Sequence, residues 1–175
     1  LFKFEVFSAL ASFRQSSLIR AATVPELELA DQEYLRQNMP KRRIKILERI
    51  LELSGENLRV RKDLADLLAR ELQIEKACVH YDALIDHERR SGHENAAMEL
   101  CRRLLALSPK HGKAHEQLAA MYAQKGQKGE AFIHYRELFE MMREQNRSQD
   151  ARIAGLCALD CDPTRMDLRN NLIEL

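Results

Sequence analysis

The chain has 175 residues, with 28 Lys or Arg and 27 Asp or Glu, so its formal net charge is only +1. A charge this small provides no general field for nucleic acid or an anionic membrane, and we expect no nucleic acid partner. Leu, Ala, Glu, Arg and Lys dominate, whereas Gly (6) and Pro (4) are scarce, a composition typical of an all-helical protein. No apolar run approaches the roughly 20 residues of a membrane span, and no secretory signal is visible.

Residues 1–22 differ from the rest of the chain by their aromatic content. Alternation with polar neighbours at the start of this segment suits a short strand, whereas spacings of three and four residues suit an amphipathic helix. We favour the helix because Ala9, Leu10 and Ala11 extend the pattern. Its aromatic side chains form either a capping face or a face that docks another helix. The candidate docking residues are Phe2, Phe4, Phe7 and Phe13.

Apolar stripes with helical spacing, separated by turn residues, predict a series of further helices. The predicted ranges are 25–38, 42–53, 58–71, 74–91, 94–107, 112–125, 128–146, 149–161 and 165–175. Pro25 suits a first helical turn, and Pro40 either ends the first of these helices or starts the second. Four cations lie where the second helix starts and oppose its dipole, so they are either a solvated surface or a contact to an acidic partner or phosphate. They are Lys41, Arg42, Arg43 and Lys45.

The cysteines and histidines do not indicate chemistry. Cys78, Cys101, Cys157 and Cys161 occupy apolar helical positions, as buried thiols do in a reducing compartment such as the cytoplasm. His111 and His115 would share one helix face, but two ligands without a third do not define a metal site. We therefore predict no metal, no cofactor and no catalytic residues, and hence no enzyme.

A repeat organises the sequence. Aligning residues 42–95 with residues 96–149, an offset of 54, matches 13 of 54 positions. The matches include Ala65 with Ala119, Tyr81 with Tyr135 and His80 with His134, so we expect each pair to have equivalent surroundings and a structural role. A third, truncated copy follows, in which Pro163 corresponds to Pro109.

The best-defined copy resembles a tetratricopeptide repeat (TPR). The residues that carry the resemblance are Leu118, Ala119, Tyr122, Gly126, Ala131, Tyr135 and Leu138, and the earlier copy offers Leu64, Ala65, Leu68, Ala77, Tyr81 and Leu84, with Leu72 in place of the turn Gly. A second frame fits Leu84, Gly92, Ala97, Cys101, Leu104 and Pro109. The resemblance covers about residues 42–175 and implies a right-handed superhelical stack of antiparallel helix hairpins. We therefore predict an N-terminal helical docking or capping segment (1–40) and a TPR-like domain (41–175).

The two frames overlap, so the repeating unit has three helices in 54 residues instead of two in 34. Either the long helices serve both roles, or one copy lies outside the regular stack. If the helices 58–71 and 112–125 line the concave face, as the resemblance implies, that face carries one row on each helix. The first row is Arg59, Lys62, Asp66 and Arg70, and the second is Lys113, Glu116 and Gln124. The family's carboxylate clamp for chaperone tails is disfavoured, because Asp66 and Ala120 stand where it needs Asn.

These observations favour a protein-binding scaffold or adaptor that docks a peptide or helix of a partner protein. Two alternatives are a structural subunit packed permanently in a large complex, with possible self-association or membrane-complex association, and a helical-repeat nucleic-acid binder. The last needs a basic inner stripe, which Asp66 and Glu116 interrupt. The chain begins at Leu1 and stops at Leu175 within an apolar pattern, so we expect it to be part of a longer protein.

Overall fold

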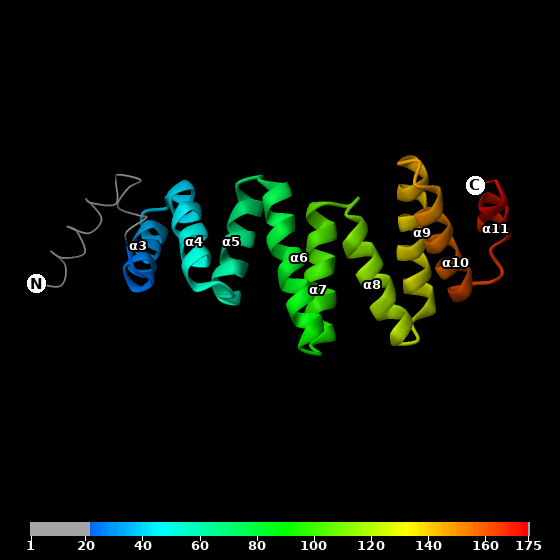
Figure 1. The fold of residues 1–175 in the computed structure, drawn as a ribbon, viewed down its shortest axis with the longest axis horizontal. Helices are drawn as coiled ribbons and strands as arrows, with labels where there is room; N and C mark the ends of the chain where they lie inside the picture. Colours follow the sequence, from blue (N-terminus) through cyan, green and yellow to red (C-terminus); the bar gives the residue numbers. More distant parts are fainter. Residues whose placement is uncertain (1–21, 175) are drawn as a thin grey trace, which may run out of the picture. The chain divides into compact units, whose positions relative to one another are not determined.

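The computed structural model describes residues 22–174, and within that range every regular element is an α-helix and no strand occurs. This confirms the predicted all-α fold class. Figure 1 labels the helices, which short turns connect. Their bounds are α3 (Val24–Arg36), α4 (Pro40–Ser54), α5 (Leu58–Arg70), α6 (Ile74–Arg90), α7 (Glu94–Leu107), α8 (Gly112–Gln124), α9 (Lys128–Glu144), α10 (Ser148–Cys161) and α11 (Met166–Ile173). The aromatic residues Phe2, Phe4, Phe7 and Phe13 lie outside the described range.

The helices repeat in the predicted 54-residue register. The first set, α5, α6 and α7, has lengths of 13, 17 and 14 residues, and the second set, α8, α9 and α10, has the same three lengths. Each helix of the second set begins 54 residues after its counterpart, as Gly112 follows Leu58. Pro40 and Glu94, which begin α4 and α7, are also 54 apart. The register therefore extends into the part of the chain where sequence matching finds no clear copy.

Turns with left-handed backbone recur at the same register positions. Asn38, Gly92 and Asn146 occupy one position, and Leu72 and Gly126 occupy another, all with φ between 52° and 75°. Glycine adopts this conformation without steric cost, whereas a bulky side chain is strained there. Leu72 therefore keeps the geometry of the TPR-like turn although its side chain does not favour it.

The chain divides into two compact units, Leu1–Leu84 and Ile85–Leu175, with the division inside α6. In the first unit α3 packs on α4, and α4 packs on α5. Their apolar stripes form the core, which contains Leu27, Ala30, Tyr34, Ile44, Ile46, Leu47, Ile50, Val60, Leu64, Ala65, Leu67 and Leu68. The predicted division into residues 1–40 and 41–175, and the right-handed superhelical course, stay predictions.

An ion pair replaces an apolar contact in the first copy of the repeat. Arg43 Nε donates to Asp31 Oδ1 at 2.8 Å, and Arg43 Nη2 donates to Asp31 Oδ2 at 3.1 Å. The two side chains are only 13% and 16% exposed. The same register positions hold buried Ile85 and Ala97 in the next copy, and buried Phe139 and Ala151 in the last. Of the four cations predicted as a solvated surface, Arg43 is thus a structural residue, and Arg42 lies 5.6 Å from the ring centre of Tyr34.

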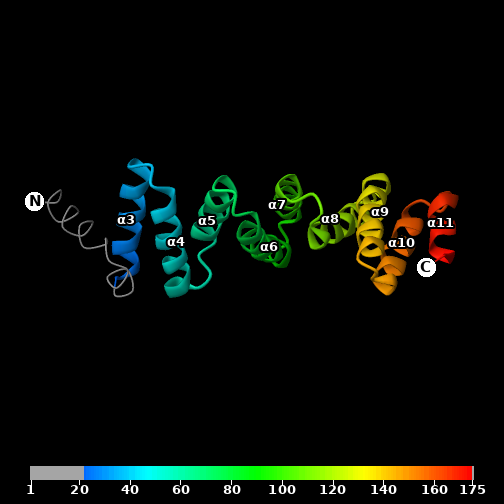
Figure 2. The same ribbon diagram turned by 90° about the horizontal axis from the view of Figure 1, so that it is seen from above.

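In the second unit each helix packs on the next, from α7 to α11. Figure 2 shows α9 beside both α8 and α10, its two most extensive neighbours. Small side chains let α10 pack closely on α9. Ala151, Ala154 and Ala158 of α10 are buried in a core that they share with Phe139 of α9. A Cβ atom added at Gly155 would lie 2.8 Å from Leu172 Cδ2, so glycine is needed where α10 meets α11.

The two repeated tyrosines match in backbone position but differ in their polar contacts. Tyr81 is buried, and its hydroxyl donates a hydrogen bond to the Asp66 carboxylate. Tyr135 is only partly buried, and Ala120 stands at the register position of Asp66. The expectation of equivalent surroundings is therefore wrong for the side chains, although the helices themselves are equivalent.

Removing the strain at Leu72 should stabilise the protein. Leu72→Gly should raise the free energy of unfolding by about 1 kcal/mol, because glycine tolerates the left-handed backbone. The matched change Gly126→Ala should lower it by about 1 kcal/mol, since no atom lies near a Cβ there and only the backbone is strained. Chemical denaturation measures both, and a loss of stability in Leu72→Gly would contradict the strained-turn assignment.

Enlarging a repeated alanine should disrupt helix packing. Ala119 is fully buried, whereas its neighbour Ala120 is partly exposed. Ala119→Leu should cost about 1–3 kcal/mol of unfolding free energy through overpacking. Ala120→Leu is the control and should cost less. Equal denaturation midpoints for Ala119→Leu and the unmodified protein would show that Ala119 does not lie at a helix contact.

Candidate functional site

Three of the four predicted groove residues on α5 are exposed cations. The side chains of Arg59, Lys62 and Arg70 are exposed, and none of them forms a hydrogen bond or ion pair with another residue in the part of the chain that the structure describes. They project from a helix whose N-terminus is capped by Asn57, whose side chain accepts a hydrogen bond from the Val60 amide at 3.2 Å. Among the described residues, these three cations therefore have no ion-pair partner.

The fourth predicted residue of this row has an internal partner. Asp66 is partly buried and accepts the hydrogen bond from the Tyr81 hydroxyl. We predicted Asp66 on the concave face beside the cations, whereas the structure gives its carboxylate an internal partner. Its carboxylate joins α5 to α6 within the first unit instead of standing free for a partner.

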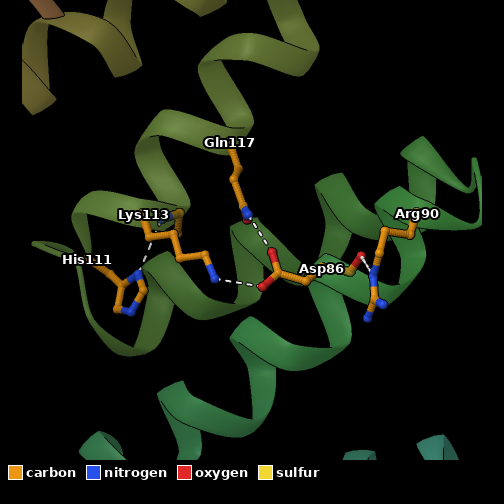
Figure 3. Close-up of polar contacts among 6 residues, drawn as sticks. Asp86, Arg90, His111, Lys113 and Gln117 are labelled. Atoms are coloured by element: carbon orange, nitrogen blue, oxygen red, sulfur yellow. Dashed lines mark hydrogen bonds and ion pairs between the residues drawn. The ribbon is translucent and has the colours of Figure 1, made fainter.

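The equivalent row on α8 is already engaged at its first position. Lys113 Nζ lies 2.7 Å from Asp86 Oδ2, and Gln117 Nε2 donates to Asp86 Oδ1 at 2.8 Å (Figure 3). Asp86 comes from the end of α6 that belongs to the second unit, so both contacts connect α6 to α8. Lys113, a predicted partner-binding residue, is therefore part of an internal link between two helices.

The ionised form of Asp86 is favoured by these contacts. Partial burial alone would raise the pKa of its carboxyl group, but the hydrogen bonds from Lys113 and Gln117 and the charges of Lys113 and Arg89 outweigh burial and lower it. Glu116 and Gln124, the other predicted residues on α8, are exposed. This row thus offers one carboxylate, one amide and an engaged lysine, unlike the cationic row on α5.

The two histidines considered as metal ligands have structural roles. His111 Nδ1 accepts a hydrogen bond from the Ala114 amide at 3.3 Å and caps α8, as Asn57 caps α5 at the same register position. His115 Nε2 lies 2.9 Å from the Pro109 carbonyl oxygen. In the last copy Arg169 donates to the Pro163 carbonyl at 3.4 Å. Among the described residues no group of three His, Cys, Asp or Glu side chains is arranged to hold a metal ion.

A polar aromatic cluster connects α7, α8 and α9. Since the Pro109 carbonyl can only accept, His115 carries its proton on Nε2, and its Nδ1 accepts from His134 Nδ1 at 3.0 Å. The ring of His134 stacks on Tyr122 with the centroids 5.7 Å apart. Arg102 Nη2 donates to the Tyr122 hydroxyl at 3.0 Å. Each member of the cluster contacts the next, which indicates a role in joining helices.

The four cysteines are free thiols: Cys78 and Cys101 are buried, and Cys157 and Cys161 are partly buried. Burial raises the pKa of Cys157 and of Cys161, and the charge of Asp160 raises both further. Raised pKa values leave little thiolate near neutral pH, so neither thiol is activated as a nucleophile.

Sequence reasoning missed Asp86 and Gln117. The equivalent positions in the preceding copy hold Gln32 and Asp63, so the repeat gives no signal for a contact between them. It also missed the contact of His115 with the Pro109 carbonyl. The donor Arg169 at the same position in the last copy, six residues after Pro163, was a usable signal for it.

Comparison with known proteins gives only distant likenesses. No protein-family model matches the chain, and no curated protein is similar to it in sequence. A crystal structure of MamA protein is 14% identical, with 84% of this chain and 86% of that chain covered and a TM-score of 0.43. MamA 41-end from Desulfovibrio magneticus RS-1 is 13% identical, with coverages of 87% and 94% and a TM-score of 0.42. A thermophilic TPR protein of Thermus thermophilus is 15% identical, with coverages of 87% and 98% and a TM-score of 0.36.

These likenesses are too distant to indicate a shared function. The chain's own helices carry the fold assignment instead, since their lengths, turns and buried alanines recur at one fixed offset. None of the described helices is long and apolar enough to cross a membrane. From α3 to α11 the chain has a tetratricopeptide-like helical repeat fold.

Acid should destabilise the protein through its repeated histidines. Burial lowers the pKa of His80, and the charge of Arg61 adds to this. Burial also lowers the pKa of His134, and the neighbouring His115 and Arg102 lower it further, against the opposing effect of Glu130 and Glu137. The unfolded chain takes up these protons near pH 6.5. The folded chain takes them up only at lower pH. The free energy of unfolding that these histidines contribute above about pH 6.5 is therefore lost as the pH falls.

We expect the Tm to fall between about pH 7.5 and about pH 5.5, and to fall less in His134→Gln, which keeps a donor for His115 but cannot titrate. Lys76→Gln, at an exposed position of α6, is the control. Differential scanning calorimetry across the pH range measures the slopes, and equal slopes for His134→Gln and the unmodified protein would exclude this contribution.

Proposed function

We propose that this chain is a protein-binding adaptor that docks an acidic, extended segment of a partner protein on the exposed face of α5. The observation that carries the proposal is the row of unpaired cations Arg59, Lys62 and Arg70. Exposed cations on a folded helix keep their side-chain entropy and full hydration until a partner arrives, so they favour recognition more than internal stability.

The spacing of the row sets the length of segment it suits. Helical rise places Arg59 and Arg70 about 16 Å apart along the helix axis. An extended peptide covers that distance with about five residues, since each adds about 3.3 Å. A segment with carboxylates near both ends would therefore meet Arg59 and Arg70, with Lys62 between them.

The contrast with α8 supports α5 as the binding helix. The register counterparts of Arg59, Lys62 and Arg70 are Lys113, Glu116 and Gln124. The first of these is paired with Asp86, the second is anionic and the third is neutral. An acidic segment would gain little on α8, so its row is not part of this binding face.

A protein fits this face better than a nucleic acid does. Asp63 and Asp66 lie on α5 among the cations. They interrupt the continuous basic stripe that a phosphate backbone needs, whereas a peptide can place single carboxylates at the separate cations. We propose that the segment with Phe2, Phe4, Phe7 and Phe13 is a second docking element for the same class of partner, through apolar contacts.

The proposal is tested with a labelled synthetic peptide in which Glu alternates with Ser, titrated into the protein by fluorescence anisotropy. Arg59→Glu, Lys62→Glu and Arg70→Glu together should weaken binding at least tenfold, because each exposed contact contributes about 0.2–1 kcal/mol and its reversal adds repulsion. The matched change Gln124→Glu should have little effect. Purification of the natural partner with the unmodified protein, but not with the triple variant, would identify it.

Two results would refute this function. The triple variant binds the peptide as tightly as the unmodified protein does, or single-stranded RNA displaces the peptide at equal concentration with a steep salt dependence. The second result would favour the nucleic-acid alternative.

A further inference from the structure

One face of α10 is apolar where the equivalent faces of α4 and α7 are charged. Three register positions on α10 hold Ile153, Leu156 and Cys157. The same positions hold Lys45, Glu48 and Arg49 on α4, and Glu99, Arg102 and Arg103 on α7. The difference is confined to the last of three equivalent helices, so the helix geometry does not require it.

The earlier faces make polar contacts of their own. On α4, Arg49 Nη1 lies 2.7 Å from Glu52 Oε2, and on α7, Arg102 Nη1 lies 3.2 Å from Glu99 Oε2. On α10 the aliphatic side chains have no such partner and remain in water. Ile153 and Leu156 are each 62% exposed.

The core of the second unit does not need this face. The opposite side of α10 is filled by Ala151, Ala154 and Ala158, which are buried in the core with Phe139. Gly155 lies against Leu172 of α11. Since both neighbouring helices pack on that side, Ile153 and Leu156 form an apolar strip, spaced i and i+3, that no described helix covers.

Carboxylates lie beside the strip. Asp160 is one turn beyond Leu156 and on the same face of α10. The negative charges of Asp160 and of Glu116, on α8, both act on Cys157 and, together with its burial, raise the pKa of that thiol. Arg152 lies at the flank of the strip, at the side of α10 away from Cys157.

We propose that the strip formed by Ile153 and Leu156, with Glu116 and Asp160 beside it, docks a cationic amphipathic helix of a partner protein. Apolar side chains of the partner, three or four residues apart, cover Ile153 and Leu156. A Lys or Arg one turn further along the partner helix meets Asp160 and Glu116. This site lies on other helices than the α5 row and selects the opposite charge, so it does not depend on the function proposed above.

The chain supplies its own design for removing the site. Ile153→Glu with Leu156→Arg transplants the Glu99–Arg102 pair of α7 into α10 and leaves the net charge unchanged. Because both positions are exposed, the double variant should keep the Tm of the unmodified protein. Val79→Glu is the control, since Val79 on α6 is 65% exposed and lies outside the strip.

The probe is a fluorescein-labelled amphipathic peptide of Leu and Lys with apolar residues at helical spacing, titrated into the full chain. We expect saturable binding that weakens at least tenfold in Ile153→Glu/Leu156→Arg and is unchanged in Val79→Glu. Glu116→Gln with Asp160→Asn should weaken it severalfold and reduce its salt dependence. The same peptide with Glu in place of Lys should not bind.

Three outcomes overturn the proposal. The double variant binds the Leu–Lys peptide as tightly as the unmodified protein does, or Val79→Glu weakens binding equally, which would place the peptide elsewhere. Equal binding of the Glu peptide would refute the cationic partner. Sedimentation that shows self-association of the unmodified chain, lost in the double variant, would mean that a second copy of this chain occupies the strip.

Discussion

The close approach of neighbouring helices at repeated alanines is the constraint on which this structure depends. Ala65 and Ala119, Ala77 and Ala131, and Ala97 and Ala151 are register pairs, and all six are 0% exposed. In the later copies a methyl group keeps such a contact close, whereas the first copy has Arg43 at the register position of Ala97 and Ala151. Larger apolar residues can then interlock around each contact, and no single hairpin buries its stripe alone. Surface residues are free to differ between copies because the alanines already fix the spacing.

Most of the fold could be predicted because its determinants are local or repeated. The helix bounds expected from spacing and turn residues lie within about two residues of those observed, which is as close as helix ends are defined. Thr23 begins α3 with a capping box in which its amide and hydroxyl both donate to Glu26 at 2.8 Å, and Pro40 starts α4. Leu72 could be placed in a turn only because Gly126 occupies the same register position.

The polar contacts could not be predicted because they belong to single copies. The link from Asp86 to Lys113 and Gln117 needs three residues that occur together once. The bond from Tyr81 to Asp66 exists in one copy, because the next copy has Tyr135 and Ala120 at these register positions and alanine cannot accept it. Repeat matching averages over such differences, so it identifies the residues that build helices and misses those that distinguish one copy from another. The candidate binding surfaces are differences of this second kind. The sequence identified the α5 row only together with the α8 row, whose Lys113 is engaged internally.

The ion pair between Arg43 and Asp31 has a consequence for assembly of the repeat. Helices that repeat at a fixed spacing could in principle exchange places, within one chain or between two, by slipping a whole period. Such a slip would set Asp31 against Ala97, or Arg43 against Ile85, and would leave a charge shielded from water without its counter-ion. Separating a pair of this kind costs about 3–5 kcal/mol, far more than the few tenths that a swap of similar aliphatic residues would involve. The pair thus distinguishes the α3–α4 copy from the two copies that follow it.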